Sequence, residues 1–154
     1  MPLRVGWVDD TAVIRALAIR IIERSGHACR SFPRHVDLLD ADRLEPFDVI
    51  VLQPEDAVPP RLTRERLLAR CPRRAIALAS GHSVGRLRDA LGVDPAAFDR
   101  FIPKPFDPEA LVRWLDELEA GGPQRGAAPV PVMPVERTDA EPRSGRHPVL
   151  EAAV

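Results

Sequence analysis

The chain has 154 residues, enough for one domain and a short additional segment. Its 22 basic and 23 acidic residues leave a formal charge of −1, which provides no field to attract nucleic acid or an anionic membrane surface. No apolar run approaches the ~20 residues of a membrane span and no signal-peptide pattern opens the sequence, so we expect a cytoplasmic protein that binds neither membranes nor nucleic acid.

Predicted strands and helices alternate along the chain. Short apolar runs predict five strands, at residues 3–8, 28–32, 48–52, 75–79 and 100–103. Apolar residues at helical spacing, bounded by glycine or proline, predict five helices, at residues 13–26, 36–44, 61–70, 83–91 and 108–121. The second helix is expected to turn Val36, Leu39 and Leu44 inward. The last helix is the clearest, with Asp107 as its N-cap and Trp114 in the core.

This alternation predicts an α/β fold in which parallel strands are joined by right-handed crossovers and helices cover both faces of the sheet. Functional sites in such sheets form beyond the carboxyl ends of the strands. That rule selects a short set of polar side chains: Asp9, Asp10, Gln53, Ser80 and Lys104. The domain is expected over residues 1–121. The proline-rich segment 122–154 is expected to be a disordered tail, with a polyproline-II ligand in "PVPVMPV" or a docking helix in "HPVLEAAV" as alternatives.

The selected side chains have a coherent chemistry but no nucleophile. Adjacent carboxylates such as Asp9 and Asp10 commonly hold Mg²⁺, while a hydroxyl and an ammonium suit a phosphoryl group. Lys104 is the only lysine beside 21 arginines, a bias that GC-rich coding explains. Because this lysine is present against that bias, we expect it at a position where arginine cannot substitute. The two cysteines, Cys29 and Cys71, have no metal-ligand spacing and are expected to be buried free thiols. His27 and His35 are expected at the surface.

The sequence resembles the receiver domain of bacterial response regulators from residue 3 to about residue 120. The resemblance rests on "VDD" after the first strand, "DVIVL" with one strand-end residue, "ASGH" after the fourth strand, and "KPFDPEAL" leading into the last helix. It implies a five-stranded parallel sheet of order 2-1-3-4-5. It also implies Mg²⁺ binding by Asp9 and Asp10, with Asp10 the direct ligand, and phosphoryl contacts from Ser80 and Lys104. Phe101 would be a switch aromatic, and the bond to Pro105 would be cis.

The phosphoacceptor position of this pattern is occupied by Gln53. An amide has no ionisable oxygen to attack phosphorus and is a poorer Mg²⁺ ligand than a carboxylate, and Pro54 stiffens the loop that follows. The chain therefore resembles a pseudo-receiver with no required cofactor and weak or absent Mg²⁺ binding. An alternative is phosphorylation on a non-standard acid such as Asp56, three residues beyond the strand.

We expect a phosphorylation-independent interaction module in two-component or phosphorelay signalling, and not an enzyme. A histidine kinase, phosphotransfer protein or other signalling protein would bind the face made by the fourth helix, fifth strand and fifth helix. A haloacid-dehalogenase-like phosphohydrolase is disfavoured because "VDDT" lacks the spacer between its acids and there is no cap domain. The sequence leaves the partner's identity and the oligomeric state open.

Overall fold

The computed structural model describes residues 1–54 and 58–121, so the predictions for Asp56 and for the tail over 122–154 lie outside the described residues. Five parallel strands form one sheet of order β2-β1-β3-β4-β5, which confirms the predicted topology. The strands are β1 (Arg4–Val8), β2 (Ala28–Phe32), β3 (Val49–Leu52), β4 (Ala75–Ser80) and β5 (Arg100–Pro103). The helices are α1 (Ala12–Arg24), α2 (His35–Leu44), α3 (Pro60–Arg70), α4 (Val84–Asp89) and α5 (Pro108–Glu119), with a short 3-10 helix, η1 (Pro95–Ala97), that the sequence did not predict.

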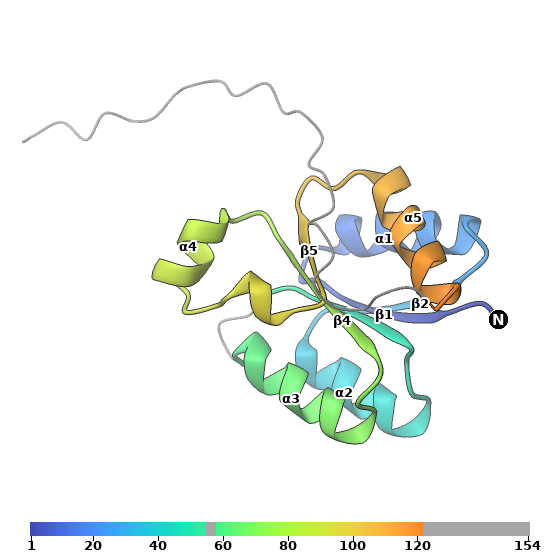
Figure 1. The fold of residues 1–154 in the computed structure, drawn as a ribbon, viewed down its shortest axis with the longest axis horizontal. Helices are drawn as coiled ribbons and strands as arrows, with labels where there is room; N and C mark the ends of the chain where they lie inside the picture. Colours follow the sequence, from blue (N-terminus) through green and yellow to red (C-terminus); the bar gives the residue numbers. More distant parts are fainter. Residues whose placement is uncertain (55–57, 122–154) are drawn as a thin grey trace, which may run out of the picture.

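The helices cover both faces of the sheet (Figure 1). On one face α1 and α5 pack over a core that includes Trp7 and Trp114; on the other, α2, α3 and α4 pack over a second core that includes Leu67. Successive residues of β3 alternate between these two cores and all four are buried. Burial on both faces explains why this strand reads as a continuous apolar run in the sequence.

Local signals set the ends of two helices. The side chain of Asp107 accepts a hydrogen bond from the backbone N–H of Glu109 at 2.9 Å, and Pro108 occupies the first turn of α5. After α1, Gly26 has φ of +91°, a left-handed conformation that glycine adopts without steric cost. Both ends lie where the sequence places them.

The predicted inward face of α2 is wrong. Val36 is 46% exposed and Leu44 91% exposed, whereas Leu39 is buried as expected. The buried positions of this helix are His35, Leu38, Leu39 and Asp42. Two of these four residues are polar, so the apolar periodicity alone points to the wrong stripe.

The prediction that both histidines lie at the surface is also wrong, because His27 is 5% exposed and His35 fully buried. Gly6 in β1 has a packing reason: a Cβ there would lie 2.7 Å from Cδ1 of Leu38, so α2 approaches the sheet closely at this point. Among the described helices, none has the length and apolar character needed to cross a bilayer.

Candidate functional site

The polar residues selected from the sequence gather at the carboxyl edge of the sheet. Asp9 and Asp10 follow β1, Gln53 follows β3, and Lys104 follows β5. The Lys104 ammonium donates to Oδ2 of Asp9 and, at 2.8 Å, to Oε1 of Gln53. One connected network therefore joins the ends of three strands.

Gln53 bridges the ammonium and one carboxylate. Its Nε2 donates to Oδ1 of Asp10 at 2.9 Å, while its Oε1 accepts from Lys104. These partners fix the orientation of the amide, since only its nitrogen can donate to a carboxylate and only its oxygen can accept from an ammonium. A carboxylate at this position could not make the contact to Asp10, because it has no donor at neutral pH.

Asp9 is completely buried, and both of its carboxylate oxygens are engaged. Oδ1 accepts the backbone N–H of Thr11 at 2.9 Å, and Oδ2 accepts from Lys104. Its backbone carbonyl accepts from Nη1 of Arg15 at 2.8 Å. The buried charge is thus paired and hydrogen-bonded, the condition under which a buried carboxylate is tolerated.

Asp10 is exposed to solvent, and its pKa lies below the ordinary value. The hydrogen bond from Gln53 is the largest cause, and desolvation opposes it. The hydroxyl of Thr11, which donates at 3.2 Å, and the charge of Lys104 also lower this pKa. The amide of Gln53 therefore stabilises the ionised form of this carboxylate.

Ser80 and Phe101 lie near this network but make other contacts. Ser80 is 2% exposed, and its Oγ accepts the backbone N–H of His82 at 3.1 Å, a turn interaction. Its carbonyl accepts the N–H of Lys104 at 2.9 Å, and the peptide bond from Lys104 to Pro105 is cis. Phe101 is half-buried and packs against the core beneath α2, α3 and α4.

The donor set at this edge does not fit Mg²⁺, the metal that the resemblance implies. Both oxygens of Asp9 and the side-chain oxygen of Gln53 already accept hydrogen bonds, the latter from a cation. Within the described part of the chain, Oδ2 of Asp10 is the only oxygen of these three side chains that accepts no hydrogen bond. A single free carboxylate oxygen is a weak anchor for an ion that requires an octahedral oxygen shell.

His35 was missed by the sequence reasoning, although it contacts the main chain at the centre of the site. Its Nε2 lies 2.6 Å from the carbonyl oxygen of Gln53, and its Nδ1 lies 2.8 Å from Oγ1 of Thr63 in α3. A carbonyl only accepts, so Nε2 is the donor and carries a proton. The end of β3 is therefore tied to both α2 and α3. No local pattern indicated this role, because residue 35 precedes the helix expected at residues 36–44.

His27, Asp116 and Glu119 form a cluster in which ligating atoms lie within 4.8 Å of one another. The Nε2 of His27 is 3.3 Å from Asp116 and 4.0 Å from Glu119, and its Nδ1 accepts the backbone N–H of Leu3 at 3.2 Å. Because that N–H occupies the Nδ1 lone pair, the ring proton of the neutral imidazole sits on Nε2. The cluster is therefore a hydrogen-bonding group rather than a metal-binding set.

Comparisons with known proteins place the fold. No protein-family model matches this sequence, and no curated protein sequence does. The chain is similar to the beryllofluoride-activated receiver domain of DrrB, with a TM-score of 0.65 and 20% identity over 78% of this chain and 99% of that one. It is also similar to the chemotaxis protein CheY4 of Vibrio cholerae, with a TM-score of 0.61 and 18% identity over 76% and 98%.

A longer protein is also similar to this chain over part of its length. The response regulator DrrB of Thermotoga maritima matches with a TM-score of 0.64 and 21% identity over 80% of this chain and 55% of that one. This chain has the fold of a response-regulator receiver domain. Its structural neighbours include response-regulator receiver domains, and the described residues form a five-stranded parallel sheet.

Proposed function

We propose that this protein is a receiver-like interaction module in two-component signalling that operates without accepting a phosphoryl group. The observation that carries the proposal is the bridge made by Gln53 between Asp10 and Lys104. The sequence resemblance implies that this amide stands where receivers have a nucleophilic carboxylate. An amide oxygen cannot form an acyl-phosphate by attack on phosphorus, because the amide has no ionisable oxygen at neutral pH.

The charge balance of the pocket supports operation without Mg²⁺. Two carboxylates, Asp9 and Asp10, face one ammonium, and the N–H of Gln53 donates to the carboxylate that Lys104 does not contact. A metal ion would have to displace hydrogen bonds that already satisfy these groups. We therefore propose that the pocket is a structural element that holds one arrangement of the strand ends.

The proposed partner surface is the face made by α4, β5 and α5. Val84 and Leu91 on and after α4 are 36% and 40% exposed and offer apolar contact area. On β5, the guanidinium of Arg100 lies 5.6 Å from the ring centroid of Trp114 and 3.8 Å from Glu117. Burial lowers the pKa of Arg100, while Glu117 opposes that shift. Arg100 is therefore a buried link between β5 and α5, and the proposed contact area on this face comes from the exposed apolar side chains of Val84 and Leu91.

The first experiment is intact mass measurement after incubation with acetyl phosphate and Mg²⁺. We expect no phosphoryl adduct on the natural chain. An adduct that disappears in Asp56→Asn would overturn the proposal and establish the alternative acceptor. Recovery of the unmodified mass in both proteins supports a module that does not receive phosphate.

A second experiment uses Gln53→Asp and measures Mg²⁺ binding by calorimetry. This variant restores a third carboxylate beside Asp9 and Asp10, and we expect it to bind Mg²⁺ at least tenfold more tightly than the natural chain. In the natural chain, millimolar Mg²⁺ should raise the free energy of unfolding by less than about 1 kcal/mol. Equal Mg²⁺ affinity in the two proteins would contradict the assignment of Gln53 to the phosphoacceptor position.

A further inference from the structure

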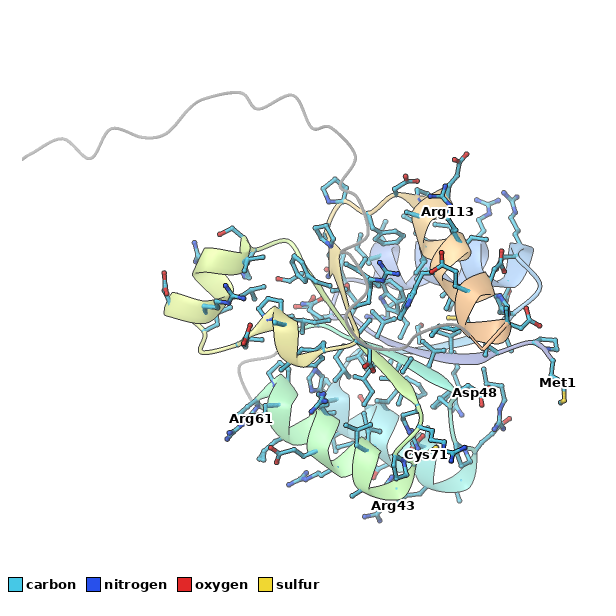
Figure 2. The ribbon with its side chains drawn as sticks, viewed as in Figure 1. Met1, Arg43, Asp48, Arg61, Cys71 and Arg113 are labelled. Carbon is cyan, nitrogen blue, oxygen red and sulfur yellow. The ribbon has the colours of Figure 1, made fainter. Side chains whose placement is uncertain are left out.

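The outer side of α5 carries a groove of about 410 Å³. Pro108 and Val112 give it apolar surface, and Glu109, Arg113 and Asp116 border it with charges of both signs. Arg113 is exposed and points away from the sheet (Figure 2). The described residues that line the groove all belong to α5, so no other element within residues 1–54 and 58–121 covers it.

The last two turns of α5 carry an excess of negative charge. Asp116, Glu117 and Glu119 lie there, and the last turn of the helix contains no basic residue. A helix C-terminus has a partial negative charge, so cations stabilise it and carboxylates do not. Glu119 and Glu117 lie 3.5 Å and 3.8 Å from a cationic nitrogen, whereas Asp116 is 59% exposed and has only His27, at 3.3 Å. The end of the groove at Asp116 therefore favours an additional cation.

The turn that ends α5 redirects the chain. Gly121 has φ of +80°, a left-handed conformation, and its N–H donates to the carbonyl of Leu118 at 3.0 Å. Four residues later the sequence has Arg125, and eight residues later the apolar run "PVPVMPV" begins, at residues 129–135. A cation and an apolar run thus follow the helix within a short length of chain.

These two features occur in the order that the groove requires. A chain that turns back along α5 meets Asp116 first and the apolar surface of Val112 and Pro108 afterwards. At a rise of 1.5 Å per residue, Val112 and Pro108 lie about 14 Å and about 20 Å from Gly121 along the helix axis. A glycine-containing chain of eight residues has an r.m.s. end-to-end distance of about 14–17 Å. Because this reach matches the span, the effective concentration of the apolar run at the groove is close to its maximum.

We propose that residues 129–135 dock on the outer side of α5, with Arg125 beside Asp116 and the prolines and valines over Val112 and Pro108. A polyproline-II conformation suits this contact, because it is ordered at low entropic cost and leaves its side chains free to meet apolar surface. A weak contact is sufficient, since the effective concentration of a segment on a short linker is in the millimolar range. Docked there, the segment limits access of a partner to α5; this consequence rests on the proposed function, whereas the docking itself does not.

The test is limited trypsin digestion of the folded full-length chain, followed by mass measurement. Trypsin cleaves after Arg125, next to the docked segment, and after Arg143, beyond it, so the ratio of the two cleavage rates reports docking. Cleavage of a reversibly protected site follows the population of the open form, so we expect Val112→Ser to raise this ratio about threefold to tenfold. Val36→Ser makes the same change at an exposed position of α2 and should leave the ratio unchanged.

The double substitution Val130→Ser and Val132→Ser should raise the ratio by the same factor. It lies outside the folded domain and therefore cannot act by unfolding α5. An unchanged ratio in either variant would overturn the proposal. Protection of Arg125 that grows with protein concentration between about 1 and 100 µM would also overturn it, because the occupant would then be a second copy of the chain. The digestion contains no partner and no phosphoryl donor, so its result is separate from the acetyl phosphate test of the proposed function.

Discussion

Replacing Gln53 by glutamate is the sharpest test of the bridge at the carboxyl edge. The substitution keeps the length of the side chain and the acceptor for Lys104, but it replaces the N–H donor facing Asp10 with a second negative oxygen. The distance from Gln53 Nε2 to Asp10 Oδ1 is 2.9 Å, so the new oxygen would begin in direct contact with a like charge.

Two effects lower the free energy of unfolding of the Gln53→Glu variant. A hydrogen bond to a charged group contributes about 1.5–3 kcal/mol in general, and less here because Asp10 is exposed and screened by solvent. Repulsion between two carboxylates in water-like surroundings adds roughly 1 kcal/mol, part of which Lys104 offsets. Together these lower the free energy of unfolding by about 1–3 kcal/mol at pH 7 and low salt.

The stability difference between the natural chain and Gln53→Glu should depend on pH. The pKa of Asp10 in the folded protein lies below its unfolded value, so its stabilising contribution is present above about pH 4 and is lost as pH falls through the folded pKa. Without the donor from residue 53 this contribution disappears. The difference between the natural chain and Gln53→Glu should therefore be largest near neutral pH and shrink below pH 4.

The assay is urea unfolding followed by tryptophan fluorescence between about pH 3 and pH 8, because buried Trp7 and Trp114 report the core. Gln124→Glu is the matched control, since it makes the same chemical change in the segment outside the described residues. A Gln53→Glu protein as stable as the control at pH 7 would refute the bridging role of the amide.

Four further substitutions, at three positions, test other contacts by urea or thermal unfolding. Lys104→Met leaves the buried carboxylate of Asp9 without its cation and should lower the free energy of unfolding by about 3–5 kcal/mol. Lys104→Arg should recover less than half of that loss. Full recovery would show that the site does not require a compact ammonium. Asp42→Asn should cost about 3 kcal/mol by leaving the charge of Arg74 buried, and a loss below about 1 kcal/mol would show that this pair is solvated. Asp107→Ala should cost about 1 kcal/mol through loss of the N-cap of α5, and an unchanged melting temperature would contradict that role.

Much of the fold follows from the sequence because its signals are local or periodic. Strand β3 is buried on both faces and reads as an unbroken apolar run, and α5 has its cap and first-turn proline in adjacent positions. The rule that sites form beyond strand ends predicts that Asp9, Asp10, Gln53 and Lys104 lie close together, as they do in the structure. These inferences need only residue order and elementary geometry.

The failures involve polar residues whose partners are distant in sequence. His35 is buried because Thr63 and the carbonyl of Gln53 satisfy its two ring nitrogens, and neither partner can be identified from residues near position 35. The same is true of Asp42, which turns inward to meet Arg74 and so shifts the buried face of α2. Burial of a polar group depends on a tertiary partner, which periodicity does not encode.

The bridge at Gln53 was also beyond sequence reasoning, because it depends on the reach of one side chain. The position reads as a lost nucleophile, but the structure gives the amide two contacts that a carboxylate could not make together. Two carboxylates and one ammonium leave one negative charge in the pocket; a third carboxylate would leave two. A metal ion offsets such an excess in an acidic site, and here a neutral amide reduces the excess and supplies a donor to the remaining charge.

The hydrogen bonds of Gln53 also connect the ends of three strands. The amide links the end of β1 to the end of β3 and, through Lys104, to the end of β5, while His35 fixes the carbonyl of the same residue. A pocket that depends on phosphoryl or metal changes when either leaves, whereas these contacts are all within the chain. Differential binding is the only means by which a ligand shifts a conformational equilibrium, so a pocket already satisfied from within gives such ligands little to act on. In the proposed interaction module, we therefore expect regulation to act at the proposed partner face made by α4, β5 and α5.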